Sequence, residues 1–127
     1  MPNLRRATIS AIAAATLMLL PADGRAARSA YVVGMGLHSC AEFGQDYKAS
    51  PQYWEPLYFF WAQGYMSGIN FLSMPVLNKY HDLSAMTVDE QMLRLRNYCD
   101  AHPLKSYYDA VLELFDSLPM LPAKGQP

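Results

Sequence analysis

The fold is decided by residues 53–74, which read YWEPLYFFWAQGYMSGINFLSM. Apolar side chains recur in this stretch at spacings of three and four, which is the period of an α-helix. The main stripe consists of Trp54, Tyr58, Trp61, Tyr65, Ile69 and Leu72, and it is widened by Leu57, Phe60 and Phe71. A helix that is apolar around most of its circumference is typical of the buried centre of a bundle. We therefore expect residues 53–74 to form the central helix of an all-α domain.

Proline and glycine positions refine this expectation for the central helix. Pro56 is expected in the first turn, where proline is tolerated, and Pro75 is expected to end the helix. Gly64 and Gly68 lie four residues apart. Without side chains, they would let another backbone approach this helix closely.

A narrow strip of the same helix is polar, and it gives a candidate partner surface. The candidate residues are Phe59, Gln63, Ser67 and Asn70. Phe59 is the one aromatic residue in this strip, and an exposed aromatic side chain there would indicate a binding surface. The alternative is a core position for Phe59 and bonds from Ser67 and Asn70 to nearby backbone groups.

A membrane-spanning helix is the other interpretation of this region, because no charged residue lies between Glu55 and Lys79. Gln63, Asn70 and several serine and glycine residues make insertion into a bilayer costly. We therefore expect a buried core helix and no stable membrane span.

Two capping boxes predict the starts of further helices. Ser39 is followed three residues later by Glu42, and Thr87 is followed by Glu90. In a capping box the hydroxyl and the carboxylate each accept a hydrogen bond from an otherwise unpaired backbone N–H. We expect one helix to begin after Ser39 and another to begin after Thr87.

The last helix is expected to begin at a corner formed by His102 and Pro103. Proline suits the first turn of a helix, so His102 is the expected cap. The apolar stripe that follows consists of Leu104, Tyr107, Tyr108, Val111, Leu112, Phe115 and Leu118. The sequence thus predicts a single-domain bundle of about four helices over residues 39–119, with a loop over 75–86 and a flexible tail over 120–127.

Residues 1–26 are expected to be a secretory signal peptide, followed by an N-terminal lead over residues 27–38. Arg5 and Arg6 precede an apolar run over residues 7–20, and small residues precede a cleavage point after Ala26. An uncleaved anchor is the alternative, but it needs about 17–25 apolar residues. We expect a cleaved, exported protein.

Cys40 and Cys99 are the two cysteines of the chain, and both fall on the apolar side of a predicted helix. In an exported protein this favours one intramolecular disulfide. A pair of free buried thiols is the alternative. A metal site is disfavoured because no second cysteine or histidine lies at ligand spacing.

Charge excludes one class of partner. Removal of residues 1–26 leaves seven basic and ten acidic side chains, so the net charge is near −3 with neutral histidines. This balance argues against nucleic-acid binding. Below about pH 3 the carboxylates are protonated and the three histidines are charged, so the net charge approaches about +10.

The sequence offers little support for a catalytic site. His81 and Asp82 are adjacent, and neighbouring residues on a loop rarely present a base and its orienting group to one substrate atom, so a solvated turn is favoured. The sequence has no glycine-rich phosphate loop and no haem-attachment motif. We expect neither an enzyme nor a bound cofactor or metal.

Three motifs in the predicted domain resemble those of a known family. They are Cys-Ala-Glu-Phe at residues 40–43, WAQGYMSGIN at residues 61–70, and NYCDAHPL at residues 97–104. With the signal peptide and the last amphipathic helix, the chain resembles the HdeA/HdeB-like family of small periplasmic proteins over residues 40–118.

The resemblance implies a small all-helical periplasmic domain with a Cys40–Cys99 disulfide. The best-known members are ATP-independent chaperones of the acid-stress response, which bind unfolding periplasmic proteins at low pH. In those members acid dissociates a dimer and loosens the fold, which exposes apolar surface. The expected partners are therefore unfolded client proteins, and a homodimer is also implied.

Two other functions stay open at this point. A similar-looking group comprises disulfide-bonded periplasmic immunity proteins, each of which blocks one cell-wall-degrading toxin; it shares the glycine-tyrosine pattern of the central helix. A structural envelope protein without activity of its own is the third interpretation, since a fold does not imply a function.

Overall fold

The structure of the protein is a computed structural model, and it describes residues 32–123. Among these residues lie four α-helices: α1 (Cys40–Ala49), α2 (Pro51–Leu77), α3 (Val88–Ala101) and α4 (Tyr107–Ser117). They are accompanied by a short 3-10 helix, η1 (Gly34–Leu37), and by two strands, β1 (Lys79–His81) and β2 (Met120–Pro122). The predicted four-helix domain is confirmed. The predicted signal peptide, residues 1–26, lies outside the described residues.

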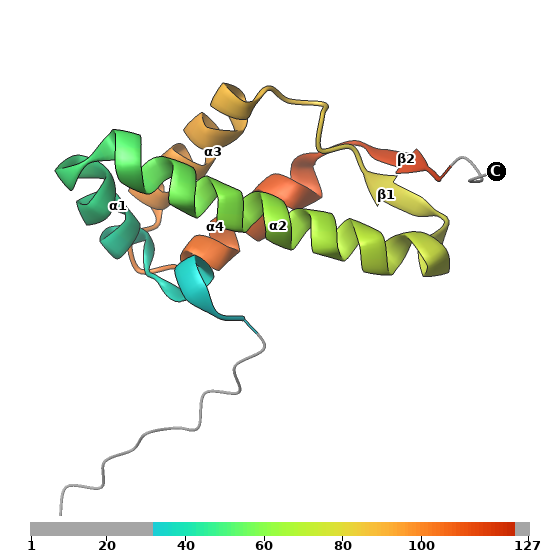
Figure 1. Cartoon of the computed structure of the whole chain (residues 1–127), viewed down its shortest axis with the longest axis horizontal. Coiled ribbons are helices and arrows are strands. Elements are labelled where there is room, and N and C mark those ends of the chain that lie inside the picture. The colour runs from blue at the N-terminus through green and yellow to red at the C-terminus, as the bar shows by residue number, and fades with distance from the viewer. Residues whose placement is uncertain (1–31, 124–127) are drawn as a thin grey trace, which may run out of the picture.

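The long helix α2 sets the shape of the molecule (Figure 1). It follows the long axis, with α1 beside its first turns and α4 behind its middle. β1 follows α2 and pairs antiparallel with β2, so that Tyr80 lies opposite Leu121. This two-stranded sheet replaces the loop expected after α2, and it includes the first residues of the expected tail.

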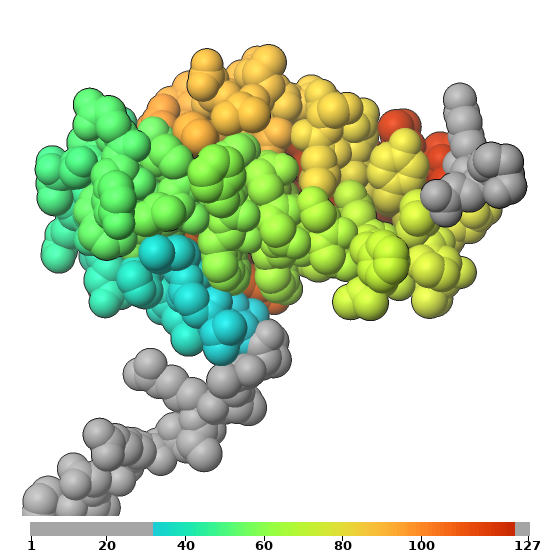
Figure 2. All heavy atoms as spheres, in the orientation of Figure 1, coloured from blue at the N-terminus to red at the C-terminus, as the bar shows by residue number. Residues whose placement is uncertain are grey.

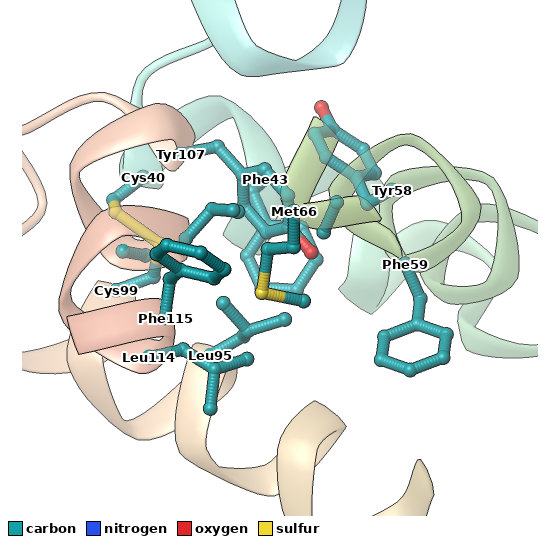
Figure 3. Packing of buried hydrophobic residues seen from close by; sticks show 13 residues of the cluster. Cys40, Phe43, Tyr58, Phe59, Met66, Leu95, Cys99, Tyr107, Leu114 and Phe115 are labelled. Atoms are coloured by element: carbon teal, nitrogen blue, oxygen red, sulfur yellow. A yellow bond between two sulfur atoms is a disulfide. The ribbon is translucent and has the colours of Figure 1, made fainter. Parts of the chain in front are cut away.

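Side chains from all four helices form one core (Figure 3). At its centre the rings of Phe43, Tyr58 and Tyr107 lie 4.9–5.0 Å apart between centroids. Such aromatic pairs stabilise a core beyond the area that they bury. Met66 from α2 and Leu95 from α3 complete the contact between the helices.

A disulfide joins Cys40, at the start of α1, to Cys99, near the end of α3, as predicted. Both cysteines are buried at one edge of the core (Figure 3). The two residues are 59 apart in the sequence. Closing a loop of this length removes unfolded-state entropy equivalent to roughly 4 kcal/mol in the chain-entropy model.

The ends of α2 differ from the expected ones. The helix begins at Pro51 and ends at Leu77, so that Pro56 and Pro75 both lie inside it. Pro51 occupies the first helical position, where a missing N–H leaves no bond unmade. Pro75 leaves the Phe71 carbonyl without a helical donor, but both residues are exposed, so water can bond it. The helix ends instead at Asn78, whose φ of 50° is left-handed.

Both expected capping boxes are formed. The Ser39 hydroxyl accepts from the Glu42 N–H at 3.2 Å, and the Glu42 carboxylate accepts from the Ser39 N–H at 2.6 Å. Thr87 and Glu90 make the same pair of bonds at the start of α3.

The cap expected at His102 is wrong. His102 ends α3, and α4 begins only at Tyr107, after a third capping box made by Ser106 and Asp109. The intervening residues 103–105 are not part of a helix, and the carbonyls of Pro103 and Lys105 accept hydrogen bonds from the start of α1. The Cys40 N–H donates to the Lys105 carbonyl at 2.7 Å, and the Ala41 N–H donates to the Pro103 carbonyl at 3.0 Å.

The described part of the N-terminal lead packs on α2. Gly36 is buried against the indole ring of Trp61, where an added Cβ atom would lie 2.1 Å from a ring carbon. The Trp61 indole N–H donates to the Val33 carbonyl at 2.9 Å. Residues 32–38 are therefore part of the domain, although the sequence suggested a boundary at residue 39.

Candidate functional site

An unusual surface belongs to the side of α2 that points away from the core. With 3.6 residues per turn, it lies opposite the buried residues Tyr58, Phe59, Ala62 and Met66. We call it the outer α2 face, and it comprises Tyr53, Leu57, Phe60, Gly64, Ser67, Gly68, Phe71 and Pro75, all of which are exposed. Figure 2 shows α2, in green, uncovered across the front of the molecule.

The outer α2 face is apolar and carries no charge. Phe60 is 69% exposed and Phe71 is 74% exposed. Between them, no heavy atom beyond the helix lies within 4 Å of a Cβ added at Gly64 or Gly68. The two glycines therefore form an open notch between two exposed aromatic rings, and no described segment fills it.

Further apolar side chains are exposed at the far end of α2 and on β2. Leu72, Val76 and Leu77 are exposed there, as are Met120 and Leu121 on β2. Large exposed apolar side chains are individually common on proteins, but a contiguous group of them marks an interaction site. Exposure of this group differs from the prediction, which placed the apolar sides of this helix at the buried centre of a bundle.

The partner surface expected from the sequence lies mainly inside the molecule. Phe59 is only 4% exposed and belongs to the core. The Gln63 amide donates to the Gln91 side chain at 2.6 Å. The Asn70 amide donates to the His81 carbonyl at 2.7 Å and accepts from the His81 N–H at 2.9 Å. Of the four candidates, Ser67 alone is exposed.

The bonds of Asn70 to backbone groups agree with the alternative interpretation of the sequence, whereas the contact of Gln63 with Gln91 has a structural role that the sequence did not indicate. Gln91 is buried, and its amide donates to the carbonyls of Leu83 and Met86 at 2.9 and 3.0 Å. With Gln63 it ties the turn before α3 to α2. Gln63 and Asn70 therefore face α3 and β1, and the side of α2 that carries Phe60 and Phe71 faces solvent.

A second feature connects three elements near η1. The Tyr58 hydroxyl donates to the Asp46 carboxylate at 2.7 Å, and its oxygen lies 2.5 Å from Nδ1 of His38. Because Tyr58 already donates its proton, Nδ1 of His38 must donate to it. Burial, with the hydrogen bond to Asp46, raises the pKa of the Tyr58 phenol above its ordinary value.

An open cleft lies beside the start of α1, with a volume of about 640 Å³. His38, Glu42 and Lys105 line it, so charges of both signs face the same space. Hydrogen bonds from the Ser39 backbone and hydroxyl lower the pKa of the Glu42 carboxyl. Nothing in this arrangement selects one class of ligand.

His81 and Asp82 do not act on a common point. His81 stacks on Phe115, with ring centroids 4.2 Å apart, and its Nδ1 lies 3.1 Å from the Leu118 carbonyl. Asp82 accepts instead from the backbone and hydroxyl of Ser84.

Residues 32–123 hold neither a cluster of metal-binding side chains nor a helix suited to a membrane. This part of the chain holds no group of three histidine, cysteine, aspartate or glutamate residues that could bind a metal. Within the same residues, no helix is both long enough and apolar enough to cross a membrane.

Comparisons with protein-family models, with curated proteins and with solved structures found no match. The resemblance to the HdeA/HdeB-like family stays a prediction. The functional argument therefore rests on the outer α2 face and on the groups that hold the helices together.

Proposed function

We propose that the protein is an exported, ATP-independent chaperone-like protein of the periplasm that binds unfolding client proteins during acid stress. The observation that carries the proposal is the outer α2 face. It exposes Phe60 and Phe71 to solvent, and none of its residues is charged. Unfolding proteins expose apolar segments of varied sequence. An apolar surface without specific polar contacts can bind many such segments.

Acid is expected to enlarge this surface, because carboxylates hold the starts of three helices. Glu42, Glu90 and Asp109 each complete a capping box. Hydrogen bonds from the N-cap residue Ser39 lower the pKa of Glu42, and those from Thr87 lower the pKa of Glu90, in both cases below the ordinary value of 4.5. The boxes of Glu42 and Glu90 thus contribute stability at pH values above that ordinary pKa, and the contribution is lost as the pH falls through the lowered pKa.

Ion pairs between helices depend on carboxylates too. Glu55 pairs with Arg96 and joins α2 to α3, and Glu113 pairs with Arg94 and joins α4 to α3. Protonation of either carboxyl group removes the attraction. The net positive charge of the chain then favours expansion through self-repulsion. The Cys40–Cys99 disulfide keeps α1 and α3 joined while the other contacts loosen.

The experiment measures light scattering by an unrelated dehydrogenase that aggregates as it unfolds. The oxidised protein is added at about pH 2–3 and at pH 7. We expect suppression of aggregation in acid, and a loss of most of it in a Phe60→Ser/Phe71→Ser variant. Leu104→Ser is the matched control, because Leu104 is 95% exposed but lies between α3 and α4.

Two further results bear on the proposal. A Cys40→Ser/Cys99→Ser variant is expected to suppress aggregation less well in acid, because its helices separate completely. Absence of suppression at both pH values, with circular dichroism showing an intact fold in acid, would overturn the proposal. Equal losses in the Leu104 control would show that the outer α2 face has no special part.

A further inference from the structure

Helix α2 extends beyond the core that its earlier turns help to form (Figure 1). Met66 is its last buried residue, and none of residues 67–77 is buried. Leu72 and Val76 lie four residues apart, so they share one side of the helix, and they are 74% and 82% exposed. Leu77, the last residue of the helix, is exposed as well. The final turns of α2 therefore present large apolar side chains to solvent.

Strand β2 adds apolar side chains to the same end of the molecule. Met120 and Leu121 on this strand are exposed. The end of β2 is bonded to the end of α2, because the Ala123 N–H donates to the carbonyl of Asn78, the residue after Leu77, at 2.9 Å. We call this end the apolar tip, and it comprises Leu72, Val76, Leu77, Met120 and Leu121, none of which belongs to the outer α2 face.

The sequence around the apolar tip lacks acidic residues. No aspartate or glutamate lies between Glu55 and Asp82, and none follows Asp116. A positive charge is present instead at Lys79, which is exposed and lies opposite Pro122 in the two-stranded sheet. The apolar tip therefore combines apolar side chains with a cation.

The acidic residues of the domain lie elsewhere. They belong to α1, α3 and α4, to the first turns of α2, and to Asp82. Asp82 is at the core end of the sheet, where its N–H donates to the Pro119 carbonyl at 2.9 Å. Its neighbour His81 stacks there on the buried ring of Phe115. Because residues 27–127 carry a net charge near −3, an anionic surface would repel the body of the domain and accept the apolar tip.

The chemistry of this end matches the surface of a lipid bilayer that contains anionic lipids. Exposed apolar side chains on a protruding helix end can enter the boundary between headgroups and acyl chains. A lysine beside them can keep its stem among apolar groups while its ammonium group reaches a lipid phosphate. The position of Lys79 next to the end of α2 allows both contacts at once.

We propose that the apolar tip inserts into the interfacial region of an anionic lipid bilayer, while the core of the domain stays in water. The contact is peripheral, with a depth of about 5–10 Å. An exported protein meets membrane surfaces, but the inference rests on the shape and charge of this end and holds whether or not the protein is a chaperone. Clients and lipid would use different residues.

The experiment is co-sedimentation of the oxidised protein with lipid vesicles at pH 7, where lysine and carboxylate side chains are charged. One set of vesicles is pure phosphatidylcholine, and the other contains equal parts of phosphatidylcholine and phosphatidylglycerol. We expect a partition coefficient at least about fivefold higher on the anionic vesicles, as for the attraction of one cation. A Val76→Ser/Leu77→Ser variant should lower partitioning at least about tenfold, because the inserted apolar groups are lost.

Matched variants separate the apolar and the charge contributions. Leu104→Ser removes a side chain that is 95% exposed but lies between α3 and α4, so it should leave binding unchanged. Lys79→Gln should abolish most of the preference for anionic vesicles and leave binding to neutral vesicles unchanged. Lys48→Gln removes an equally exposed cation from α1, at the opposite end of the molecule, and should change neither (Figure 1).

A tryptophan at the apolar tip reports insertion directly. In a Val76→Trp variant, lipids with brominated acyl chains should quench the new indole. The native Trp61 lies 15 residues earlier on α2, about 22 Å along the helix, so its fluorescence should remain. Wild-type protein on the same vesicles supplies this reference.

Absence of binding to anionic vesicles would overturn the inference, as would binding that Val76→Ser/Leu77→Ser leaves intact. Equal binding to both sets of vesicles would overturn the assignment to an anionic surface. The two proposals fail in different experiments. If Val76→Ser/Leu77→Ser reduces suppression of aggregation but no vesicle binds the wild type, the apolar tip serves proteins and not lipid.

Discussion

Phe59 and Phe60 are neighbours in the sequence and have opposite environments. Phe59 is buried in the core, whereas Phe60 projects into solvent on the outer α2 face. Apolar periodicity could not distinguish them, because α2 is apolar on both sides and the pattern permits either orientation. The packing partners on α3 and α4 decide which side is buried.

This difference predicts unequal effects of the same substitution. Phe59→Ala should lower the free energy of unfolding by about 3–5 kcal/mol, because it leaves a cavity in the core. Phe60→Ala should change it by less than about 1 kcal/mol. Urea denaturation at a protein concentration low enough to keep the chain monomeric measures both values. Equal losses would contradict the burial seen for Phe59.

Two glycines make a similar contrast. Gly36→Ala would place a methyl group against Trp61, whose ring is held by stacking on Tyr65 and by its bond to Val33. We expect a loss of about 1–3 kcal/mol, as for other overpacked sites. Gly64→Ala should instead stabilise the monomer by about 0.5–1 kcal/mol, because the position is open and alanine favours a helix.

Thermal unfolding followed by circular dichroism tests this contrast between the two alanine variants. Tryptophan fluorescence gives a second readout, because a detached η1 would expose Trp61 to water. An unchanged melting temperature for Gly36→Ala would show that η1 moves aside without cost.

At the scale of elements, the sequence predicts helix starts better than helix ends or helix orientation. The capping boxes at Ser39 and Thr87 have clear local signatures, and both are present. The box at Ser106 lacks the usual sequence signature, because its carboxylate comes from Asp109 in place of a glutamate. The corner before it depends on bonds from α1 to residues 103–105, which no local pattern could indicate.

The candidate site was less predictable than the fold for a related reason. The polar residues of an apolar helix permit two interpretations, a partner surface or bonds within the domain, and Gln63 and Asn70 bond to Gln91 and to the backbone of β1. These partners are distant in the sequence. The spacing of Phe60, Gly64, Gly68 and Phe71 was the available signal, and it acquires meaning only once the opposite side of α2 is known to be buried.

The capping boxes also predict a pH dependence. The pKa values of Glu42 and Glu90 are lowered by the hydrogen bonds of their boxes, so their stabilising contribution disappears as the pH falls from about 5 through those lowered values. A Glu42→Gln/Glu90→Gln variant should therefore show a flatter dependence of unfolding free energy on pH in this range.

Urea denaturation at several pH values between about 3 and 7 measures this slope. Asp89→Asn is the matched control, because Asp89 lies in the first turn of α3 but is not part of the capping box. If the double variant and the wild type lose stability in parallel, other carboxylates control the acid response.

At the scale of the whole molecule, the disulfide is the main covalent constraint. Replacing both cysteines by alanine should lower the free energy of unfolding by about 2–5 kcal/mol. Equilibrium denaturation at pH 7 measures the loss. A change below about 1 kcal/mol would show that the noncovalent contacts between α1 and α3 suffice.

The position of this disulfide in the chain also determines which part can leave first. The loop that it closes contains α1, α2, β1 and α3, whereas α4 lies beyond Cys99. When contacts weaken and β2 also releases its pairing with β1, α4 can leave the core while it stays attached through residues 102–106, and the rest stays covalently closed. Its inner side carries Tyr107, Val111, Leu114 and Phe115, all buried in the folded domain. Detachment of α4 would expose both its own apolar side and the core surface that it covers. Hydrogen exchange should therefore record α4 as the first helix to lose protection.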